Sequence, residues 1–218
     1  RESLAGKKAV VTAGPTYEKL DPVRFIGNFS SGKMGFAIAG ELADRGAEVT
    51  LVAGPVSLTV DHPRIRRVDV ESAEEMCDAT VQAFADSDIA VFSAAVADYR
   101  PAERKEQKIK REGVATQTIE LVRNPDIAAR CGDMKHHGQV TVGFALETDD
   151  GHDAAHSKLH NKNLDFVVLN SLKDKGAGFR TDTNRVTIVS ADAEQAFPLK
   201  SKREVAADIV DAIETVSY

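Results

Sequence analysis

FAIAGELADRGAEVTLVAGP, residues 36–55, is the stretch of sequence that decides the fold. Its apolar residues at 36–45 have the spacing of an amphipathic helix, and Gly46 stands where a helix C-cap is expected. Residues 48–53 form a short apolar, β-branched run that predicts a buried strand. A similar run, KKAVVTA at residues 7–13, comes before the helix. Strand, helix and strand in this order predict a parallel βαβ unit with a right-handed crossover.

The same alternation continues along the chain. Further helices are predicted at residues 73–85, 126–130 and 153–160, and further strands at 89–96, 140–146 and 166–169. Residues 185–189 and 196–199 lie too close for a crossover helix, so they predict an antiparallel pair, followed by a last helix at 203–215. The sequence therefore predicts an α/β fold with a Rossmann-like, doubly wound, mainly parallel sheet and an antiparallel C-terminal extension. Because no repeat or linker interrupts the pattern, we expect residues 1–218 to form a single domain.

Composition and charge narrow the classes of function. Of the 218 residues, 42% are hydrophobic and 6% aromatic, with no Trp, so we expect a core of Val, Ile, Leu and Ala. The net charge of −6 argues against general affinity for nucleic acids or membranes, because no overall positive field attracts phosphates. No apolar run approaches the ~20 residues that cross a membrane, and no signal peptide is recognisable.

The cysteines indicate the redox compartment of the protein, and the first residue bears on the extent of the polypeptide. Cys77 and Cys131 form neither a C-x-x-C pair nor a metal-ligand pattern. Unpatterned cysteines are typical of a reducing compartment, so we expect a cytoplasmic protein. The chain begins with Arg1 rather than Met, which favours its being a piece of a longer polypeptide.

Two segments are too long or too polar to serve only as connections. Residues 14–35 separate the first strand from its helix, whereas a βα loop is typically ~2–6 residues. This segment ends in GNFSSGKMG at 27–35, whose small residues before a helix predict an anion site; a flexible capped turn is the alternative. In the polar loop at 97–116, residues 100–111 carry six basic and two acidic side chains. A loop of this charge on an acidic protein predicts an anionic partner, with a solvated surface as the alternative.

The sequence matches two other nucleotide-binding motifs only in part. Gly27-x4-Gly32-Lys33 resembles a Walker A loop, but Met34 stands where a Ser or Thr would hold Mg²⁺. The same region resembles in composition the phosphate-binding loop and helix of a short-chain reductase. It lacks the glycine spacing of that motif and an acidic residue at the end of the second strand. Tyr99 is followed four residues later by Glu103 instead of the catalytic lysine. An NADP-dependent reductase and a catalytically silent nucleotide-binding module remain alternative hypotheses.

Polar residues at predicted strand and helix ends are further candidates. Asp98 follows the strand at 89–96, and ligands of doubly wound sheets lie beyond the carboxyl ends of strands. It is placed to bind a ribose hydroxyl or a metal, with a helix cap or salt bridge as the equal alternative. The segment NPDI at 124–127 starts a helix, which capping alone explains. Lys158 and Lys162 share one helical face, where like charges repel unless an anion lies between them.

Several motifs together resemble one family. They are TAGPTYEKLDPVRFIGNFSSGKMGFAIA (12–39), AAVADYR (94–100), KIKR (108–111), NPDI (124–127), GFALET (143–148) and KLHNKNLD (158–165). In order and spacing, over nearly the whole chain, they are similar to the bacterial phosphopantothenate–cysteine ligase family. Such domains usually form the C-terminal half of a bifunctional coenzyme A biosynthesis protein. The resemblance also has departures: KIKR stands for the usual K-x-K-K, and Leu146 for an expected Ala.

The resemblance implies a reaction in two steps. The carboxylate of 4′-phosphopantothenate attacks the α-phosphorus of CTP, giving an acyl-cytidylate and pyrophosphate; the amine of L-cysteine then displaces CMP. It also implies Mg²⁺ on the triphosphate, a homodimer with its interface near the active site, and fusion to a decarboxylase domain that carries FMN. The chemistry agrees with the cationic segments, because a carboxylate and a triphosphate must be brought together.

The resemblance assigns roles to individual residues. It implies that Asn28 holds the acyl-nucleotide, that Arg24 and Ala95 serve the second step, that Lys108 is the flap lysine for the nucleotide phosphates, and that Asp98 binds the nucleotide and its metal. The remaining implied nucleotide contacts are Pro125, Asp126, Ile127, Ala128, Phe144, Lys158 and Lys162. The glycine-rich segment before the first helix adds Ser30, Ser31 and Gly32 as candidate contacts of the nucleotide.

Overall fold

The computed structural model describes residues 2–109, 113, 115–148, 151–172 and 181–216. Its main feature is a nine-stranded sheet with the order β12-β11-β10-β9-β6-β1-β4-β5, in which β13 also pairs with β11. The strands are β1 (Lys8–Ala13), β4 (Glu48–Ala53), β5 (Ile65–Asp69), β6 (Ile89–Phe92), β9 (Val140–Glu147), β10 (Phe166–Ser171), β11 (Thr183–Ser190), β12 (Glu194–Ala196) and β13 (Lys200–Ser201). From β5 through β1 to β10 all pairings are parallel, and β11 pairs antiparallel with β10, β12 and β13. The α/β fold with a mainly parallel sheet and an antiparallel C-terminal extension is confirmed.

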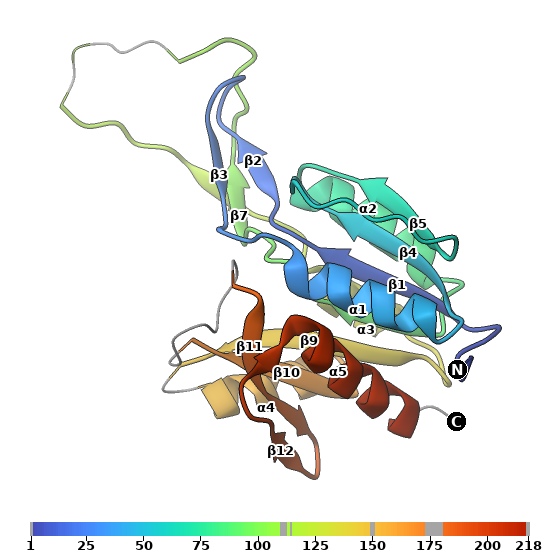
Figure 1. Ribbon diagram of the computed structural model, residues 1–218. Helices are drawn as coiled ribbons and strands as arrows, with labels where there is room; N and C mark the ends of the chain where they lie inside the picture. The colour runs from blue at the N-terminus through green and yellow to red at the C-terminus, as the bar shows by residue number, and fades with distance from the viewer. Residues whose placement is uncertain (1, 110–112, 114, 149–150, 173–180, 217–218) are drawn as a thin grey trace.

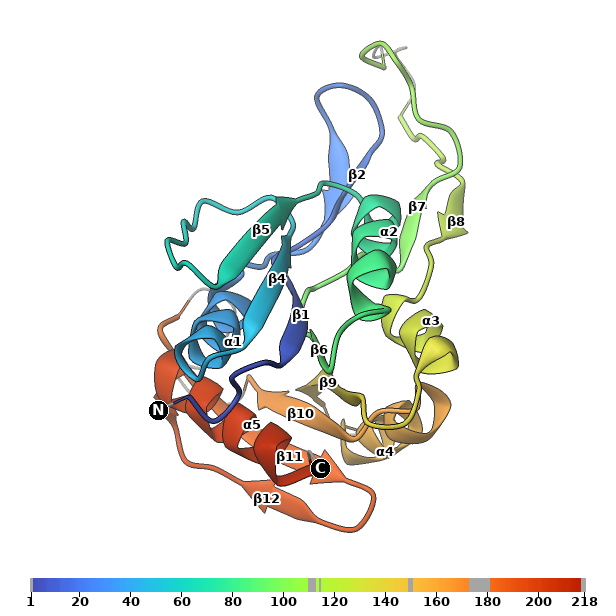
Figure 2. The same cartoon turned by 90° about the vertical axis from the view of Figure 1, so that its right-hand side faces the viewer.

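Five helices cover the two faces of this sheet in the described part of the chain (Figures 1 and 2). They are α1 (Lys33–Asp44), α2 (Ala73–Phe84), α3 (Ile127–Met134), α4 (Gly151–Asn161) and α5 (Lys202–Val216). Helices α1 and α5 bury Ile38, Leu42 and Ile209 on one face, with Val and Ile side chains of the strands. Helices α2, α3 and α4 bury Met76 and Cys131, among others, on the opposite face. No helix in the described ranges is long and apolar enough to cross a membrane.

The structure corrects several predicted bounds. The strand predicted at 89–96 ends at Phe92, because the chain leaves the sheet at Ser93. The first helix begins at Lys33, three residues before the predicted start, so part of the glycine-rich segment is helical. The antiparallel pair exists, but its second strand is Glu194–Ala196 rather than 196–199. Strand β5 was not predicted at all.

Both long connections contain strands and together form an arm. The first holds the hairpin of β2 (Tyr17–Lys19) and β3 (Phe25–Gly27), and the second starts with β7 (Tyr99–Pro101), which pairs with β8 (Leu121–Arg123). We call these two hairpins, with the described part of the segment between β7 and β8, the arm. The hairpins lie side by side and project away from the sheet (Figure 1).

Asp21 joins the two halves of the arm. Its buried carboxylate accepts hydrogen bonds from the backbone N–H of Ile109 (3.0 Å) and from Arg24 Nη2 (2.6 Å), and Arg24 Nη2 also donates to Ile109 O (2.7 Å). Burial opposes the charge of this carboxylate, but the hydrogen bonds outweigh it and hold the pKa of Asp21 well below its ordinary value. The carboxylate therefore stays ionised and keeps both connections together.

The start of α1 is packed directly against the sheet. A Cβ atom at Gly35 would lie 2.5 Å from Ala13 Cβ and 2.7 Å from Ser93 Oγ, so only glycine allows this approach. At Gly40, on the same helix, a Cβ would meet nothing within 4 Å.

We therefore expect opposite effects from the same substitution at two positions of α1. Gly35→Ala should lower the free energy of unfolding by about 1–3 kcal/mol, because the added methyl overpacks a closed contact. Gly40→Ala should raise it by about 0.5–1 kcal/mol, because alanine is the better helix former in open space. Urea unfolding of both variants checks this, and equal effects at the two positions would contradict the packing argument.

Candidate active site

Two adjoining cavities lie beyond the carboxyl ends of β1, β6, β9 and β10. Each has a volume of about 400 Å³. They share a wall, formed by Ala94, Val96, Asp98, Phe144 and Lys158. Because this wall is common to both, the two cavities form one continuous cleft at the edge where ligands of doubly wound sheets bind.

The first cavity collects most of the predicted nucleotide contacts. Its lining includes Asp98, Pro125, Asp126, Ile127, Ala128, Phe144, Lys158 and Lys162. They come from the end of β6, the start of α3, β9 and α4, which are far apart in the sequence. The structure thus brings these residues together, although their contacts with a nucleotide stay a prediction.

Asn124 holds two walls of the first cavity together. From the sequence it was interpreted only as part of a helix start. Its buried side chain donates from Nδ2 to Ala97 O at 2.8 Å, and its backbone N–H donates to Asp98 O at 2.8 Å. These bonds fix the loop that carries Asp98 against the loop that enters α3. The signal in the sequence was a polar residue beside Pro125, which is equally typical of an ordinary cap.

Lys158 and Lys162 place positive charge on one side of the first cavity. Lys158 Nζ donates to Phe144 O at 2.9 Å, and Lys162 Nζ lies 3.0 Å from Asp126 Oδ2. Burial first, and then the charge of Lys162, lowers the pKa of the Lys158 ammonium. Burial raises the pKa of Asp126, but the N–H of Ala129 and the ammonium of Lys162 outweigh it, and the net shift is downward. The capping interpretation of Asp126 is confirmed, since it accepts from Ala129 N at 3.0 Å.

The second cavity is built around the glycine-rich helix start. Asn28, Ser30, Gly32 and Ala95 line it, and Ser31 lies outside it at the helix start, where its Oγ accepts from Lys33 N. Asn28 Nδ2 donates to Ala95 O at 3.0 Å, so two residues with predicted roles in the reaction are in contact. Ala95 N in turn donates to Gly14 O at 2.9 Å. The loops that follow β1 and β6 are thereby tied together at the floor of the cleft.

Asn170, Asn184 and Lys202 also line the second cavity and were not predicted. Asn170 and Asn184 lie on neighbouring strands, and Asn184 Nδ2 donates to Asn170 Oδ1 at 2.9 Å. Lys202, the first residue of α5, is only 6% exposed. A polar residue inside an apolar strand such as FVVLNS is a recognisable signal, because burying an amide is unfavourable unless it has a partner. Lys202 gave no such signal, since a lysine at a helix start is ordinarily solvated.

Arg24 and Lys108 lie on the arm and line neither cavity. Arg24 is bound to Asp21 and Ile109, and Lys108 is exposed beside it. The structure therefore brings Arg24 and Lys108 close to each other, but not to the cleft of the same chain. Lys110 and Arg111, the rest of the KIKR motif, lie outside the described residues.

Known proteins are similar to this chain in sequence and in structure. Residues 4–216 match the DNA/pantothenate metabolism flavoprotein C-terminal domain. The chain belongs to this family. The structure is also similar to a crystal structure of the C-terminal domain of the coenzyme A biosynthesis bifunctional protein CoaBC. The TM-score is 0.83 and the identity 41%, over 99% of this chain and 97% of that one.

Relatives of known sequence are longer than this chain. It is 53% identical over 216 residues to a cysteine/cysteine sulfinic acid decarboxylase of an unknown prokaryotic organism. It is 46% identical over 213 residues to CoaBC of Haemophilus influenzae. These alignments cover 99% and 98% of this chain, but 60% and 52% of the two relatives. The chain thus spans little more than half the length of the curated relatives that it matches.

A complex of a Cab2 mutant with phosphopantothenate-cysteine has the same fold. Its TM-score is 0.76 with 20% identity, over 96% of this chain and 86% of that one.

We expect Lys158→Gln to weaken binding of a triphosphate at the first cavity. Losing a charge-assisted contact of about 1.5–3 kcal/mol corresponds to a rise of about ten- to a hundredfold in the Kd for MgCTP, measured by titration calorimetry. An anion raises the lowered pKa of Lys158, so binding takes up a proton and affinity falls as the pH rises through the pKa of the free protein. The variant should lose this part of the pH dependence. An unchanged Kd and pH profile would place the triphosphate elsewhere.

Proposed function

We propose that this chain joins 4′-phosphopantothenate to L-cysteine, using CTP and passing through a phosphopantothenoyl-cytidylate. The observation that carries the proposal is the continuous cleft, with most of the predicted nucleotide residues in its first cavity and Asn28 with Ala95 in its second. The shared wall, with Lys158 and Asp98, is the place where a carboxylate and an α-phosphorus meet. Family membership and the CoaBC neighbour support the same reaction.

The arrangement of charges suits the first step. The substrate carboxylate approaches from the second cavity, and the nucleotide lies in the first, with Lys158 and Lys162 beside its phosphates. A cation at the reacting phosphate stabilises the charge that develops as the oxygen attacks and pyrophosphate leaves. The Asn28 amide, held by Ala95 O, stands next to the acyl group of the product.

In the second step the amine of cysteine attacks the acyl carbon and CMP leaves. The cysteines of the chain itself take no part in this proposal. Burial raises the pKa of the Cys131 thiol to about 12, and Cys77 is also buried with a raised pKa. A thiol that stays protonated is a poor nucleophile, so no covalent enzyme intermediate is expected.

Mg²⁺ fits this site as a companion of the triphosphate. Among the described residues no group of three or more His, Cys, Asp or Glu side chains is placed to hold a metal. Asp98 at the shared wall is the residue that would contact the ion, with phosphate oxygens and water as the other ligands, which is the usual arrangement for Mg²⁺. The ion would supply charge neutralisation on the phosphates.

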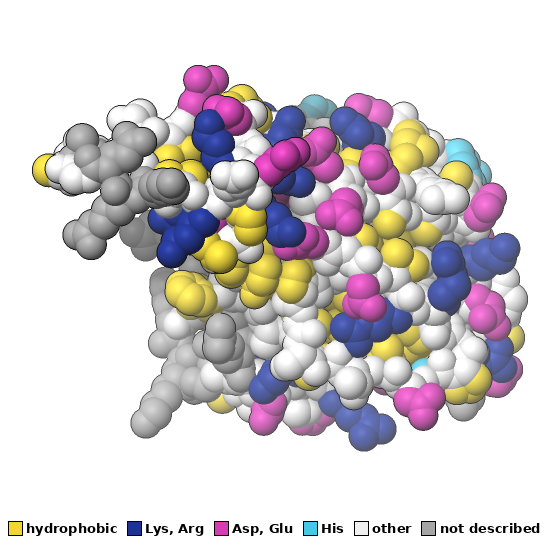
Figure 3. Space-filling view, turned by 90° about the horizontal axis from the view of Figure 1, so that it is seen from above, with side chains coloured by type: hydrophobic (Ala, Val, Ile, Leu, Met, Phe, Trp, Pro, Cys, Tyr) yellow, Lys and Arg dark blue, Asp and Glu magenta, His cyan; other side chains and the backbone are white. Residues whose placement is uncertain are grey.

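We also propose a cytoplasmic homodimer in which the arm reaches the partner. Apolar side chains gather where the arm meets the body of the molecule (Figure 3), and Val23 is 61% and Phe29 81% exposed. Large apolar side chains exposed on one part of the surface favour a protein partner. A second copy would cover it and would bring Arg24 and Lys108 to a cleft that they do not reach within their own chain.

The length of the relatives supports a further domain in the complete protein. We propose that this domain is a decarboxylase that carries FMN, in agreement with the name of the 53% identical relative.

Pyrophosphate release tests the reaction directly. The chain should release pyrophosphate from CTP when 4′-phosphopantothenate is added, and CMP when L-cysteine follows; ATP should be the poorer triphosphate. Asn28→Ala should slow both half-reactions by at least about tenfold if one contact to the acyl-nucleotide is lost. Asn161→Ala, an exposed asparagine at the end of α4, is the matched control. No pyrophosphate with either triphosphate would end the ligase proposal, and oxidation of NADPH would favour the reductase instead.

Mixed dimers test the role of the arm. Lys108→Gln and Lys158→Gln should each have low activity when prepared alone. If the arm serves the partner's cleft, mixing them puts both substitutions into one site of each heterodimer and leaves the other site intact. A statistical mixture should then recover about a quarter of the wild-type activity. Activity that stays at the level of the single variants would show that Lys108 does not act across the interface.

A further inference from the structure

Arg100 contacts the lining of the first cavity without being part of it. It belongs to β7, and its side chain is 28% exposed. Its Nη1 donates to Arg123 O at 2.8 Å and to Asn124 Oδ1 at 3.1 Å, and both of these residues line the cavity. Its Nε lies 3.2 Å from Glu74 Oε1 in the first turn of α2, and Figure 2 shows β7 running beside that helix. One guanidinium therefore joins the base of the arm, α2 and the loop that enters α3.

The bond from Arg100 determines which way the Asn124 amide points. An asparagine side chain has one acceptor oxygen and one donor nitrogen, and turning the amide over exchanges the two. With Oδ1 bound to the guanidinium, Nδ2 faces Ala97 O and donates to it at 2.8 Å. The reversed amide would place Oδ1 against Ala97 O and Nδ2 against the guanidinium, so an acceptor would face an acceptor and a donor would face a donor. Arg100 therefore selects the orientation in which Asn124 binds Ala97.

The orientation of this amide matters because it sets the distance between two segments of the cavity. The Asn124 amide binds the loop that carries Asp98, and the chain continues from Asn124 directly into Pro125 and the start of α3. Asn124 is only 6% exposed, and a buried amide oxygen that loses its partner is unfavourable. Without Arg100 the amide would either keep an unpaired oxygen or turn over and release Ala97. In both cases the connection between the two segments is weakened.

We propose that Arg100 is a positioning residue of the first cavity, which holds Asp98 and the start of α3 at the separation that a bound nucleotide requires. It acts through Asn124 and does not itself line the cavity. The inference rests on the proposed function for the identity of the nucleotide. The pair with Glu74 contributes little to this role, because the Glu74 side chain is 53% exposed and an ion pair in water is weak.

Hydrogen exchange tests the positioning without any ligand. The backbone N–H of Asn124 donates to Asp98 O, so its exchange rate reports how often the two segments separate. In Arg100→Gln this amide should exchange at least about tenfold faster, as expected for the loss of one charge-assisted hydrogen bond. Amides of β1 and β4 should keep their wild-type rates. In Arg100→Lys, whose ammonium can still donate to Asn124 Oδ1, the acceleration should be smaller. No acceleration at Asn124, or an equal acceleration throughout the sheet in both variants, would overturn the proposal.

Titration calorimetry with MgCTP measures the consequence for the cavity. Arg100→Gln should raise the Kd of MgCTP by about tenfold and leave the Kd of 4′-phosphopantothenate unchanged, because that acid belongs to the second cavity. At saturating MgCTP the kcat of pyrophosphate release should stay within about twofold of the wild type, so the effect falls on KM. Arg100→Lys should recover part of the affinity. Arg130→Gln removes an equal charge from an exposed position of α3 and is the matched control, with a wild-type Kd.

A double-mutant cycle separates action through Asn124 from action through Glu74. If Arg100 acts through Asn124, Asn124→Ala and the double variant Asn124→Ala/Arg100→Gln should have the same Kd for MgCTP. Glu74→Gln, which removes only the pair with α2, should have a Kd close to that of the wild type. Additive effects at positions 100 and 124, or a Glu74→Gln variant that binds as weakly as Arg100→Gln, would contradict the proposed route.

The same preparations distinguish a failure of this inference from a failure of the proposed function. Faster exchange at Asn124 and weaker MgCTP binding in Arg100→Gln, with no pyrophosphate released by the wild type, would keep the role of Arg100 and end the ligase reaction. Pyrophosphate release by the wild type, with unchanged exchange and an unchanged Kd in Arg100→Gln, would keep the reaction and overturn the role of Arg100.

Discussion

The structure depends on the meeting of two loops at the centre of the sheet. The chain runs outward from β1 to β4 and β5 in one direction, and from β6 to β9 and β10 in the other. Between β1 and β6 the order reverses, and the loops that follow these strands separate to form a crevice. The Ala95 N–H to Gly14 O bond and the Asn28 Nδ2 to Ala95 O bond close its floor. The second cavity lies on this floor and the first adjoins it at the shared wall, so the position of the site follows from the order of the strands.

Local charge distinguishes the cleft from the rest of an acidic protein. The net charge of −6 repels the anions that the proposed reaction brings together. The cleft reverses this locally, with Lys158 of α4 and Lys162 just after α4 at one cavity, and Lys33 with Lys202 at the other. Each lysine is partly or largely buried, and burial strengthens its interaction with an anion because water screens it less. The same burial lowers the pKa values of Lys158 and Lys202, because the charged form of a buried lysine is disfavoured until an anion is bound.

Periodicity and strand order made the body of the fold predictable, and the missed parts depend on contacts between distant residues. Strands β1, β4 and β10 are continuous apolar runs, which the sequence displays directly. Strand β5, IRRVD, was missed because two arginines interrupt its apolar pattern, and Arg67 is placed by partners outside the strand: it donates to Leu58 O and lies over the ring of Phe36. The three-residue strands of the arm are too short for a periodic signal, and they exist because they pair with each other.

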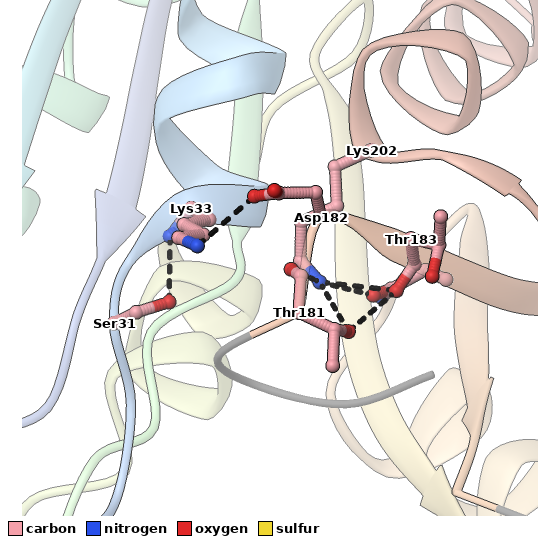
Figure 4. Close-up of polar contacts among 7 residues, drawn as sticks. Ser31, Lys33, Thr181, Asp182, Thr183 and Lys202 are labelled. Atoms are coloured by element: carbon pink, nitrogen blue, oxygen red, sulfur yellow. Dashed lines mark hydrogen bonds and ion pairs between the residues drawn. The ribbon is translucent and has the colours of Figure 1, made fainter. Parts of the chain in front are cut away.

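The residues of the candidate site were likewise predicted where a local motif marks them and missed where their role depends on a distant partner. Residues that carry a motif, such as Asn28, Asp98 and Lys158, were assigned from the resemblance, and the structure brings them into one cleft. Asn124 and Lys202 were not, because what makes them special is a partner elsewhere in the chain. Asn124 matters through Ala97, and Lys202 through Asn184 and through Thr181, which Figure 4 shows beside it. Neither partner can be read from the local sequence.

The geometry of the arm explains why Lys108, to which the resemblance assigns a flap role, lies outside the cleft of its own chain. Its two halves leave the sheet from β1 and from β6, on either side of the crevice, and are joined by the ionised Asp21. Because Arg24 and the backbone at Ile109 share that carboxylate, a displacement of one carries the other with it. Whatever surface the arm contacts therefore receives Arg24 and the basic flap as one unit. This coupling has a physical reason if the flap serves the cleft of another chain. A cation that acts in that cleft must be held in a fixed orientation, and the buried Asp21 carboxylate with its several hydrogen bonds provides that orientation.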